Sequence, residues 1–298
     1  MRFVAPEREA VDRSVFSRPP LSQWRAFDDL LRSAEWPGID ALNRHCKPGS
    51  PRFVAQTPEL LADGLHYEQR IFERGAIATR ERNWHDLLNA LIWLRFPQIK
   101  ASLNARQAAE IRIAGPKTRT RAQCALTHFD EAGVVVLLRA PALLDLWDAH
   151  DWHGLFWRES DAWRDGQIEA HVFGHALLEH ALVPEQLLVG KALVFAVPQS
   201  GNVESALTVV ARSIGAGDLL NDPQGLRPLP LSGVPGWRLA DATEDFYRSA
   251  PCFQPLRAGR HYPSARGFQE IADPICSPSP TVRLPSPVQS KGYRCGNR

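Results

Sequence analysis

One apolar stretch with polar residues at its start decides the fold of this 298-residue chain: residues 83–97 read NWHDLLNALIWLRFP. Asn83 is a typical N-cap residue, and Asp86 stands three positions later, where a capping box places its acid. Leucines recur at positions 87, 91 and 94, which is the spacing of one face of a helix. Pro97 interrupts this helix and can begin the next one. The stretch therefore predicts a bent pair of helices over residues 83–95 and 97–113.

Polar side chains are confined to the start of the first helix. His85 and Asn89 are four residues apart and share a helical face, which Asp86 adjoins. A buried amide or imidazole without a partner costs roughly 1–3 kcal/mol, so these groups must bind protein, metal or substrate. The alternative is a structural cap, in which Asp86 complements the helix dipole and His85 bonds a neighbouring carbonyl.

The second helix carries a similar polar pair. Lys100 and Asn104 are four residues apart, while Ile99 and Leu103 mark the core side. A lysine beside an apolar helix pair can bind phosphate or carboxylate. The competing interpretation is a lysine that buries its aliphatic stem and keeps the ammonium in water.

Residues 127–131, THFDE, place an imidazole beside two acids just before Gly133. Residues 126–131 are expected to form a strand or turn edge. On a strand, His128 and Asp130 would point to one face and Glu131 to the other, so the two acids could bind one ion only at a bend. An acidic hairpin turn is the structural alternative.

Residues 173–180, FGHALLEH, predict a helix on which His175 and Glu179 are four residues apart. This spacing suits shared metal ligation or an ion pair. The zinc helices HExxH and HxxEH have one residue fewer between their histidines. His175 and His180 would diverge by about 140° on a regular helix, so they are not expected to chelate one ion together.

The rest of the chain alternates short helices and strands. Strands are expected at 52–56, 66–72, 76–79, 134–139, 168–173 and 191–197, and helices at 21–34, 39–45, 141–150, 152–163, 174–182 and 203–220. We therefore expect a mainly helical α+β fold, in which residues 1–257 form a single domain with a small mixed or antiparallel sheet. Residues 258–298 hold six Pro and five Ser without hydrophobic periodicity, which predicts a disordered tail.

Charge separates the body from this tail. The chain has 35 Lys and Arg against 33 Asp and Glu, for a net charge of +2. The tail holds six of these cations and two acids, so it is basic and the body is slightly acidic. Nucleic acid is therefore not an expected partner of the body, and only the tail could attract it.

Several common classes are excluded by the absence of their motifs. The sequence has no GxxxxGK[ST], GxGxxG or GxSxG and no EF-hand loop, and no two cysteines stand two to four residues apart as in zinc knuckles. The first residues lack the apolar centre of a signal peptide, and no apolar run approaches the ~20 residues of a membrane span. We expect a cytoplasmic protein without a membrane partner.

The motifs together resemble a bacterial family of uncharacterised proteins, domain of unknown function 3025. The residues that carry the resemblance are Arg80, NWHD (83–86), Asn89-Ala90, Trp93, Phe96-Pro97, Lys100, Asn104, LTHFDEAG (126–133), FGHALLE (173–179), PLP (228–230), GVPGW (233–237), Phe246-Tyr247 and Phe253. The resemblance extends from about Leu21 to Arg257, so the tail lies outside it. It implies no activity, since none is established for the family.

Two hypotheses follow for function. In the first, the polar residues converge on one pocket of a hydrolase-like or phosphoryl-chemistry enzyme, and the catalytic candidates are His85, Asp86, Asn89, Lys100, Asn104, His128, Asp130, Glu131 and His175. His85 or His175 would be the general base, and Lys100 would stabilise an oxyanion. Asp130 or Glu131 would orient the base or hold a divalent metal, for which the candidate ligands are Asp130, Glu131, His175 and Glu179.

In the second hypothesis the protein is a non-catalytic binding or interaction protein. The same polar groups would then satisfy one another as a buried network that stabilises the fold. The partner, a small molecule or a protein, is left open. The spatial grouping of the motif residues separates the two hypotheses.

Overall fold

The computed structural model describes residues 3–115, 117–184, 186–238 and 243–267. Its α-helices are α1 (Asp28–Leu31), α2 (Ile39–Arg44), α3 (Pro58–Leu61), α4 (Tyr67–Arg74), α5 (Trp84–Arg95), α6 (Pro97–Ala114), α7 (Arg121–Ala132), α8 (Leu143–Asp148), α9 (Ser160–Arg164), α10 (His175–His180), α11 (Val203–Ala216) and α12 (Glu244–Ser249). Its strands are β1 (Arg52–Ala55), β2 (Ala76–Thr79), β3 (Gly133–Leu138), β4 (Ile168–Val172), β5 (Val189–Ala196), β6 (Arg227–Pro230) and β7 (Arg266–Gly267). The fold is α+β and mainly helical, as the sequence predicts.

The strands form two small sheets. The larger sheet has the order β4-β3-β5-β6, and β7 also pairs with β5. It is mixed, because β3 is parallel to β5 but antiparallel to β4, and β6 is antiparallel to β5. All six residues of β3 are buried, as expected of a central strand. The smaller sheet consists of β1 and β2, which are parallel and are connected through α3 and α4.

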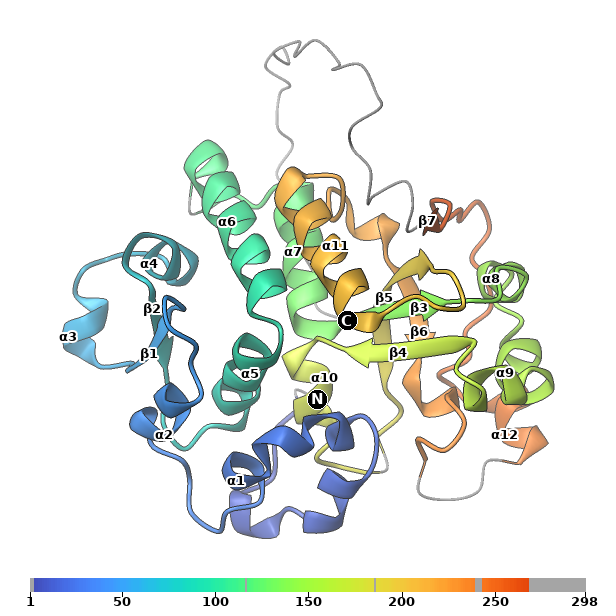
Figure 1. Ribbon diagram of the computed structural model, residues 1–298, viewed down its shortest axis with the longest axis horizontal. Helices are drawn as coiled ribbons and strands as arrows, with labels where there is room; N and C mark the ends of the chain where they lie inside the picture. Colours follow the sequence, from blue (N-terminus) through green and yellow to red (C-terminus); the bar gives the residue numbers. More distant parts are fainter. Residues whose placement is uncertain (1–2, 116, 185, 239–242, 268–298) are drawn as a thin grey trace.

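A layer of helices lies between the two sheets. Figure 1 shows α5, α6, α7, α10 and α11 between β1–β2 on one side and the five-stranded sheet on the other. The core side of α5 is completely buried at Leu88, Leu91 and Ile92. Because this helix is covered from several directions, the polar residues at its start must also find partners inside the protein.

The predicted helix pair is confirmed together with its boundaries. The side chain of Asn83 accepts a hydrogen bond from the backbone N–H of Asp86, and α5 follows directly. Pro97 is the first residue of α6. An N–H at this position has no partner within the helix, so the proline loses no hydrogen bond there. Asn89 of α5 and Asn104 of α6 both form hydrogen bonds with α4, so the two helices share this neighbour.

Two of the expected strands are wrong, because both segments are helical. Residues 126–131 belong to α7, which begins with a capping box between Thr120 and Gln123. Residues 66–72 fall mostly in α4, whose start is capped by the side chain of His66 and whose end is marked by Gly75 at φ 62°. Both segments contain too few apolar residues to distinguish a helical period from a strand period. The capping residues at their ends identify them as helices.

The predicted tail begins within the described residues. Tyr262 lies with its hydroxyl 3.0 Å from Nε2 of His150, and the carbonyl of Pro263 accepts a hydrogen bond from Arg227 at 2.6 Å. Residues 258–267 therefore contact the domain, and the remainder of the predicted tail lies outside the described residues. Among the described helices, none is both long and apolar enough to cross a membrane.

Candidate functional site

A polar cavity of about 330 Å³ lies where the ends of several helices meet. Its walls come mainly from α4, α5, α6, α7 and α10, with β2 and the segment before α7 at the edge. The lining residues are Gln56, His66, Tyr67, Glu68, Ala78, Arg80, His85, Asp86, Asn89, Gln107, Ile111, Arg119, Gln123, Thr127, Asp130, Glu131 and His175. Six of the nine residues predicted from sequence to be catalytic line this one cavity.

Two histidines face each other at one end of the cavity. Nε2 of His85, from the first turn of α5, lies 3.0 Å from Nε2 of His175, the first residue of α10. Nδ1 of His85 donates to Glu179 at 2.9 Å, and this hydrogen bond raises the pKa of the His85 imidazole. Burial lowers the pKa of His175 to about 3, so this imidazole is neutral at physiological pH.

Glu131 completes a group of three potential metal ligands. One of its carboxylate oxygens lies 3.5 Å from Nε2 of His175, and ligand atoms of Glu131, His85 and His175 all lie within 4.8 Å of one another. Burial raises the pKa of the Glu131 carboxyl in the absence of a cation. Two imidazoles and one carboxylate are a donor set of the kind that catalytic zinc sites use, so the residues present fit a divalent transition metal.

Carboxylates also lie behind both imidazoles. Glu179 binds Nδ1 of His85, and an oxygen of Asp130 lies 4.0 Å from Nδ1 of His175. Both Nε2 atoms therefore face the position between the two rings. For His85 this arrangement is the one in which a carboxylate orients a metal-binding histidine from its far side, whereas Nδ1 of His175 has no hydrogen-bond partner among the described residues.

The sheet register brings Glu131 and His175 together although they are far apart in sequence. α7 runs into β3, β4 runs into α10, and Val134 of β3 pairs with Val172 of β4. The carbonyl of Gly133 accepts hydrogen bonds from the N–H groups of Phe173 and Gly174 at 2.9 and 2.8 Å. The last turn of α7 and the first turn of α10 therefore meet at one end of the antiparallel strand pair.

Lys100 organises a second group of polar residues next to the histidines. Its ammonium donates to Asp130 at 2.6 Å and to Asn89 at 2.9 Å, and Asn89 in turn donates to the hydroxyl of Tyr67 at 3.0 Å. Burial alone would raise the pKa of Asp130, but the charge and hydrogen bond of Lys100 together with the neighbouring histidines outweigh it and hold this pKa below its ordinary value. Asp130 is therefore an ionised carboxylate, and Lys100, which is only 4% exposed, is fully engaged.

Glu68 provides a carboxyl group with an unusual pKa on another wall of the cavity. The amide of Asn104 donates to both the Glu68 carboxylate, at 2.6 Å, and the Glu68 carbonyl, at 2.8 Å. Burial raises the pKa of Glu68 to about 7, although the Lys100 charge acts in the opposite direction. A carboxyl group that titrates near neutral pH can both accept and release a proton there.

Asp86 has a mainly structural position at the edge of the cavity. It accepts hydrogen bonds from the backbone N–H of Arg80 at 2.6 Å and from the Arg80 guanidinium at 2.7 and 3.1 Å. These bonds connect the end of β2 to the start of α5. Asn83 is therefore the cap, as predicted, whereas Asp86 binds Arg80 without closing a capping box. His85 contacts Glu179 and His175 and not a neighbouring carbonyl.

The structure separates the sequence candidates into three sets. His85, Asp86, Asn89, Asp130, Glu131 and His175 line the cavity, and Lys100, Asn104 and Glu179 lie directly behind lining residues. His128 does not line it, and burial and the charge of Lys191 lower its pKa instead. Of the four predicted metal ligands, only Glu131 and His175 belong to the three-residue group, and His85 is the third.

Sequence reasoning missed Tyr67 and Glu68 because residues 66–72 were assigned to a strand. A signal for the correct assignment exists. An acid in the first turn, Glu68, an Arg in the last turn, Arg74, and Gly75 directly afterwards are together typical of a short helix. Because the helix starts at residue 67, Tyr67 and Glu68 both belong to its first turn, and both line the cavity.

Replacing Glu68 by glutamine should change the pH dependence of stability. A carboxyl with a pKa of about 7 in the folded state and an ordinary pKa when unfolded binds its proton more tightly in the folded state. The stability that this tighter proton binding gives the folded state is therefore lost as pH rises from about 5 to 7. The loss reaches about 3 kcal/mol for a pKa difference of about 2.5. Urea unfolding of metal-free protein at pH 5 to 8 should show Glu68→Gln becoming more stable than wild type over this range.

Glu73→Gln is the matched control for this measurement, since Glu73 lies on the same helix but is exposed. Its stability relative to wild type should be the same at every pH. A constant difference between Glu68→Gln and wild type from pH 5 to 8 would contradict the raised pKa.

The fold and the site define a class of α+β protein in which the ends of several helices enclose a polar cavity with two histidines and a glutamate at one end. The chain belongs to the family described as Protein of unknown function (DUF3025), whose model matches residues 51–257. The matched region contains every residue that lines the cavity. Neither the curated proteins nor the solved structures include a match to this chain.

Proposed function

We propose that this protein is a divalent-metal-dependent hydrolase whose metal is held by His85, Glu131 and His175. The observation that carries the proposal is the convergence of one ligand atom from each of these residues, all within 4.8 Å of one another, at the wall of a polar cavity. Three protein ligands leave a coordination position open for water or substrate, which is the arrangement of catalytic rather than structural zinc sites. A bound divalent ion supplies Lewis acidity and lowers the pKa of a coordinated water.

The residues around the ligands support this role. Glu179 orients the His85 imidazole from behind, and Asp130, which Lys100 helps to keep ionised, lies 4.0 Å from Nδ1 of His175. Because Lys100 already donates to Asp130 and Asn89 and does not line the cavity, we assign it to positioning instead of oxyanion stabilisation.

Glu68 is the best candidate for proton transfer within the cavity. Its carboxyl lines the same cavity as the three ligands and titrates near pH 7, because it is buried. Asn104 holds it in place through two hydrogen bonds. In the proposed reaction Glu68 accepts a proton from the attacking water and returns it to the leaving group, which is the ordinary task of a general acid–base residue.

The remaining cavity walls indicate a hydrophilic substrate. They contain the amides of Gln56, Gln107 and Gln123 and the hydroxyl of Thr127, whereas Ala78 and Ile111 are the only aliphatic residues among those that line it. Such walls bind a substrate through directed hydrogen bonds. Esters, amides and phosphate esters of small polar molecules are the substrate classes that we propose to test, in the cytoplasmic and bacterial setting expected from the sequence.

A specific observation also favours the non-catalytic alternative. Lys100, Asp130, Asn89 and Tyr67 form a connected chain in which each polar group has a partner from another segment. A network of this kind stabilises a fold without any chemistry. The alternative is then a protein that binds a polar ligand or a metal at the cavity and does not transform it.

Each of the variants His85→Ala, Glu131→Gln and His175→Ala should lower the affinity for Zn²⁺ at least 100-fold. Removing one of three ligands leaves the ion with two protein donors, and even loss of an orienting partner typically costs 10- to 100-fold. The measurement is calorimetric titration of metal-free protein with Zn²⁺ and Mn²⁺ at pH 7, with the bound metal counted by mass spectrometry.

His128→Ala is the control, because it removes a histidine from α7 that does not line the cavity. Its metal affinity should equal that of wild type. Failure of wild type to bind either ion, or equal losses in His128→Ala and the ligand variants, would contradict the metal site. Tight metal binding without metal-dependent hydrolysis of any of the three substrate classes would favour the binding protein.

A further inference from the structure

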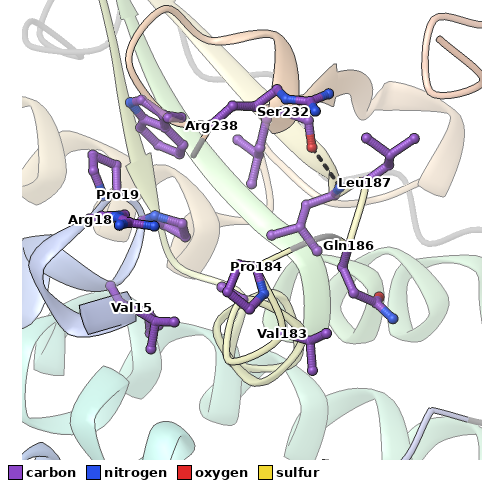
Figure 2. Close-up of a pocket in the computed structure, with 15 residues that line it drawn as sticks. Val15, Arg18, Pro19, Val183, Pro184, Gln186, Leu187, Ser232 and Arg238 are labelled. Atoms are coloured by element: carbon purple, nitrogen blue, oxygen red, sulfur yellow. Dashed lines mark hydrogen bonds between the residues drawn. The ribbon is translucent and has the colours of Figure 1, made fainter. Parts of the chain in front are cut away.

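A second cavity, of about 80 Å³, lies away from the polar cavity and shares no residue with it. It is enclosed by the N-terminal segment 15–21, the segment 181–188 that follows α10, and residues 231–238 after β6. Figure 2 shows aliphatic side chains such as Val15, Val183 and Leu187 around it, together with Pro19 and Pro184. Most of the side chains that line it are apolar, polar atoms share its surface with them, and the proposed hydrolase does not use it.

Two arginines are among the residues that line this cavity. Arg18 comes from the N-terminal segment and Arg238 from the segment after β6, so they approach the cavity from different sides (Figure 2). Within the part of the chain that the structure describes, neither side chain forms an ion pair, and Nη1 of Arg18 is buried without a hydrogen-bond partner. A buried charged donor without an acceptor is costly, so an anion at this position would stabilise the site.

Two further contacts prepare the cavity for an acceptor. The guanidinium of Arg238 lies 3.9 Å from the ring centroid of Phe246, and this stacking restricts its orientation. The hydroxyl oxygen of Ser232 accepts a hydrogen bond from the N–H of Leu188 at 3.0 Å, which leaves the hydroxyl proton free to be donated. Arg18 and Ser232 thus offer donors at a cavity that Arg238 also lines, beside apolar side chains.

We propose that this cavity binds a short aliphatic monocarboxylate. A carboxylate matches the planar fork of an arginine and can accept from the other donors, while a short alkyl chain suits the leucine, valine and proline walls. The small volume favours a ligand of this size over a nucleotide or a long-chain lipid. Part of the site comes from residues 231–238, none of which lines the polar cavity.

The test compares hexanoate with its uncharged analogue hexanamide by calorimetric or NMR titration of the full chain at pH 7. EDTA is present throughout, so that the carboxylate cannot bind through a metal in the polar cavity. Wild type should bind hexanoate saturably, at least tenfold more tightly than hexanamide. Arg18→Gln and Arg238→Gln should each weaken hexanoate binding at least tenfold. If one of the two variants misfolds, the other still tests the proposal.

Two control variants separate this site from the rest of the molecule. Arg44→Gln removes an exposed arginine at the end of α2, and His85→Ala removes a residue of the polar cavity; both should bind hexanoate like wild type. Because the assay contains no free metal, its outcome is independent of the proposed hydrolase. The proposal is overturned by absence of saturable binding up to about 10 mM. Equal affinity for hexanamide, unchanged binding in both glutamine variants, or equally effective displacement by inorganic phosphate would overturn it as well.

Discussion

Replacing Lys100 by methionine should lower the free energy of unfolding by about 3–5 kcal/mol. The ammonium of Lys100 is 4% exposed and donates to Asp130 at 2.6 Å and to Asn89 at 2.9 Å. Methionine fills nearly the same volume but leaves the Asp130 carboxylate, whose side chain is 20% exposed, without its cation. The effect should appear as a lower urea midpoint at pH 7, with an unchanged dependence of unfolding free energy on urea.

A double variant distinguishes the charge effect from the loss of packing. Lys100→Met combined with Asp130→Asn removes the unpaired charge, so it should recover a large part of the stability lost in Lys100→Met alone. Such a recovery would also support an ionised Asp130 at pH 7, because only a charged partner leaves an unpaired charge when Lys100 is removed. If the single variant loses less than about 1 kcal/mol, or if the second substitution adds a further loss of similar size, then the buried ion pair does not have the role assigned to it.

Replacing Gly174 by alanine should cost at least about 3 kcal/mol and should also weaken metal binding. A Cβ atom at this position would lie 2.5 Å from the Cα atom of Ala132, the carbonyl oxygen of Glu131 and the backbone nitrogen of Gly133. All three are backbone atoms, so no side chain can rotate away. The ends of α7 and α10 would have to separate, and with them Glu131 and His175.

Gly215→Ala is the control for this prediction. Gly215 lies in α11, and a Cβ atom there would meet nothing closer than the Ser102 side chain at 3.5 Å, an ordinary contact. Alanine should therefore leave the stability unchanged or raise it by up to about 1 kcal/mol. Thermal unfolding and Zn²⁺ titration of both variants provide the comparison, and a Gly174→Ala protein that matches wild type in both would contradict the close approach of the two helices.

Much of the fold could be predicted from the sequence, because its strongest elements carry complete local signals. The helix pair α5 and α6 has a capping residue, an apolar stripe and a proline at the break, and it forms where these signals place it. The buried strand β3 follows from its run of valines and leucines. The wrong assignments are at 66–72 and 126–131, where apolar residues are too few to define a period and the helix caps carry the information.

The candidate site was predicted in part. Nine polar residues were predicted because they interrupt apolar segments, and a polar group on a buried element needs a partner. Six of the nine line the cavity. His128 satisfies the same criterion but does not line the cavity. The strand assignment also placed Asp130 and Glu131 on opposite faces, whereas on α7 Asp130 binds Lys100 and Glu131 lies beside His175.

By itself, the sequence determined the fold class, the principal helices and which polar residues must find partners inside the protein, since capping and hydrophobic periodicity act between residues a few positions apart. Only the tertiary structure decided which of these residues meet. His85 and His175 are 90 residues apart in the chain, and their contact depends on the packing of α10 against α5. The contact between Glu131 and His175 depends on the register of β3 with β4 and on a glycine without a Cβ atom at the crossing. Packing and register are properties of the assembled chain, so no local pattern of residues specifies the three-residue group that we propose as the metal site.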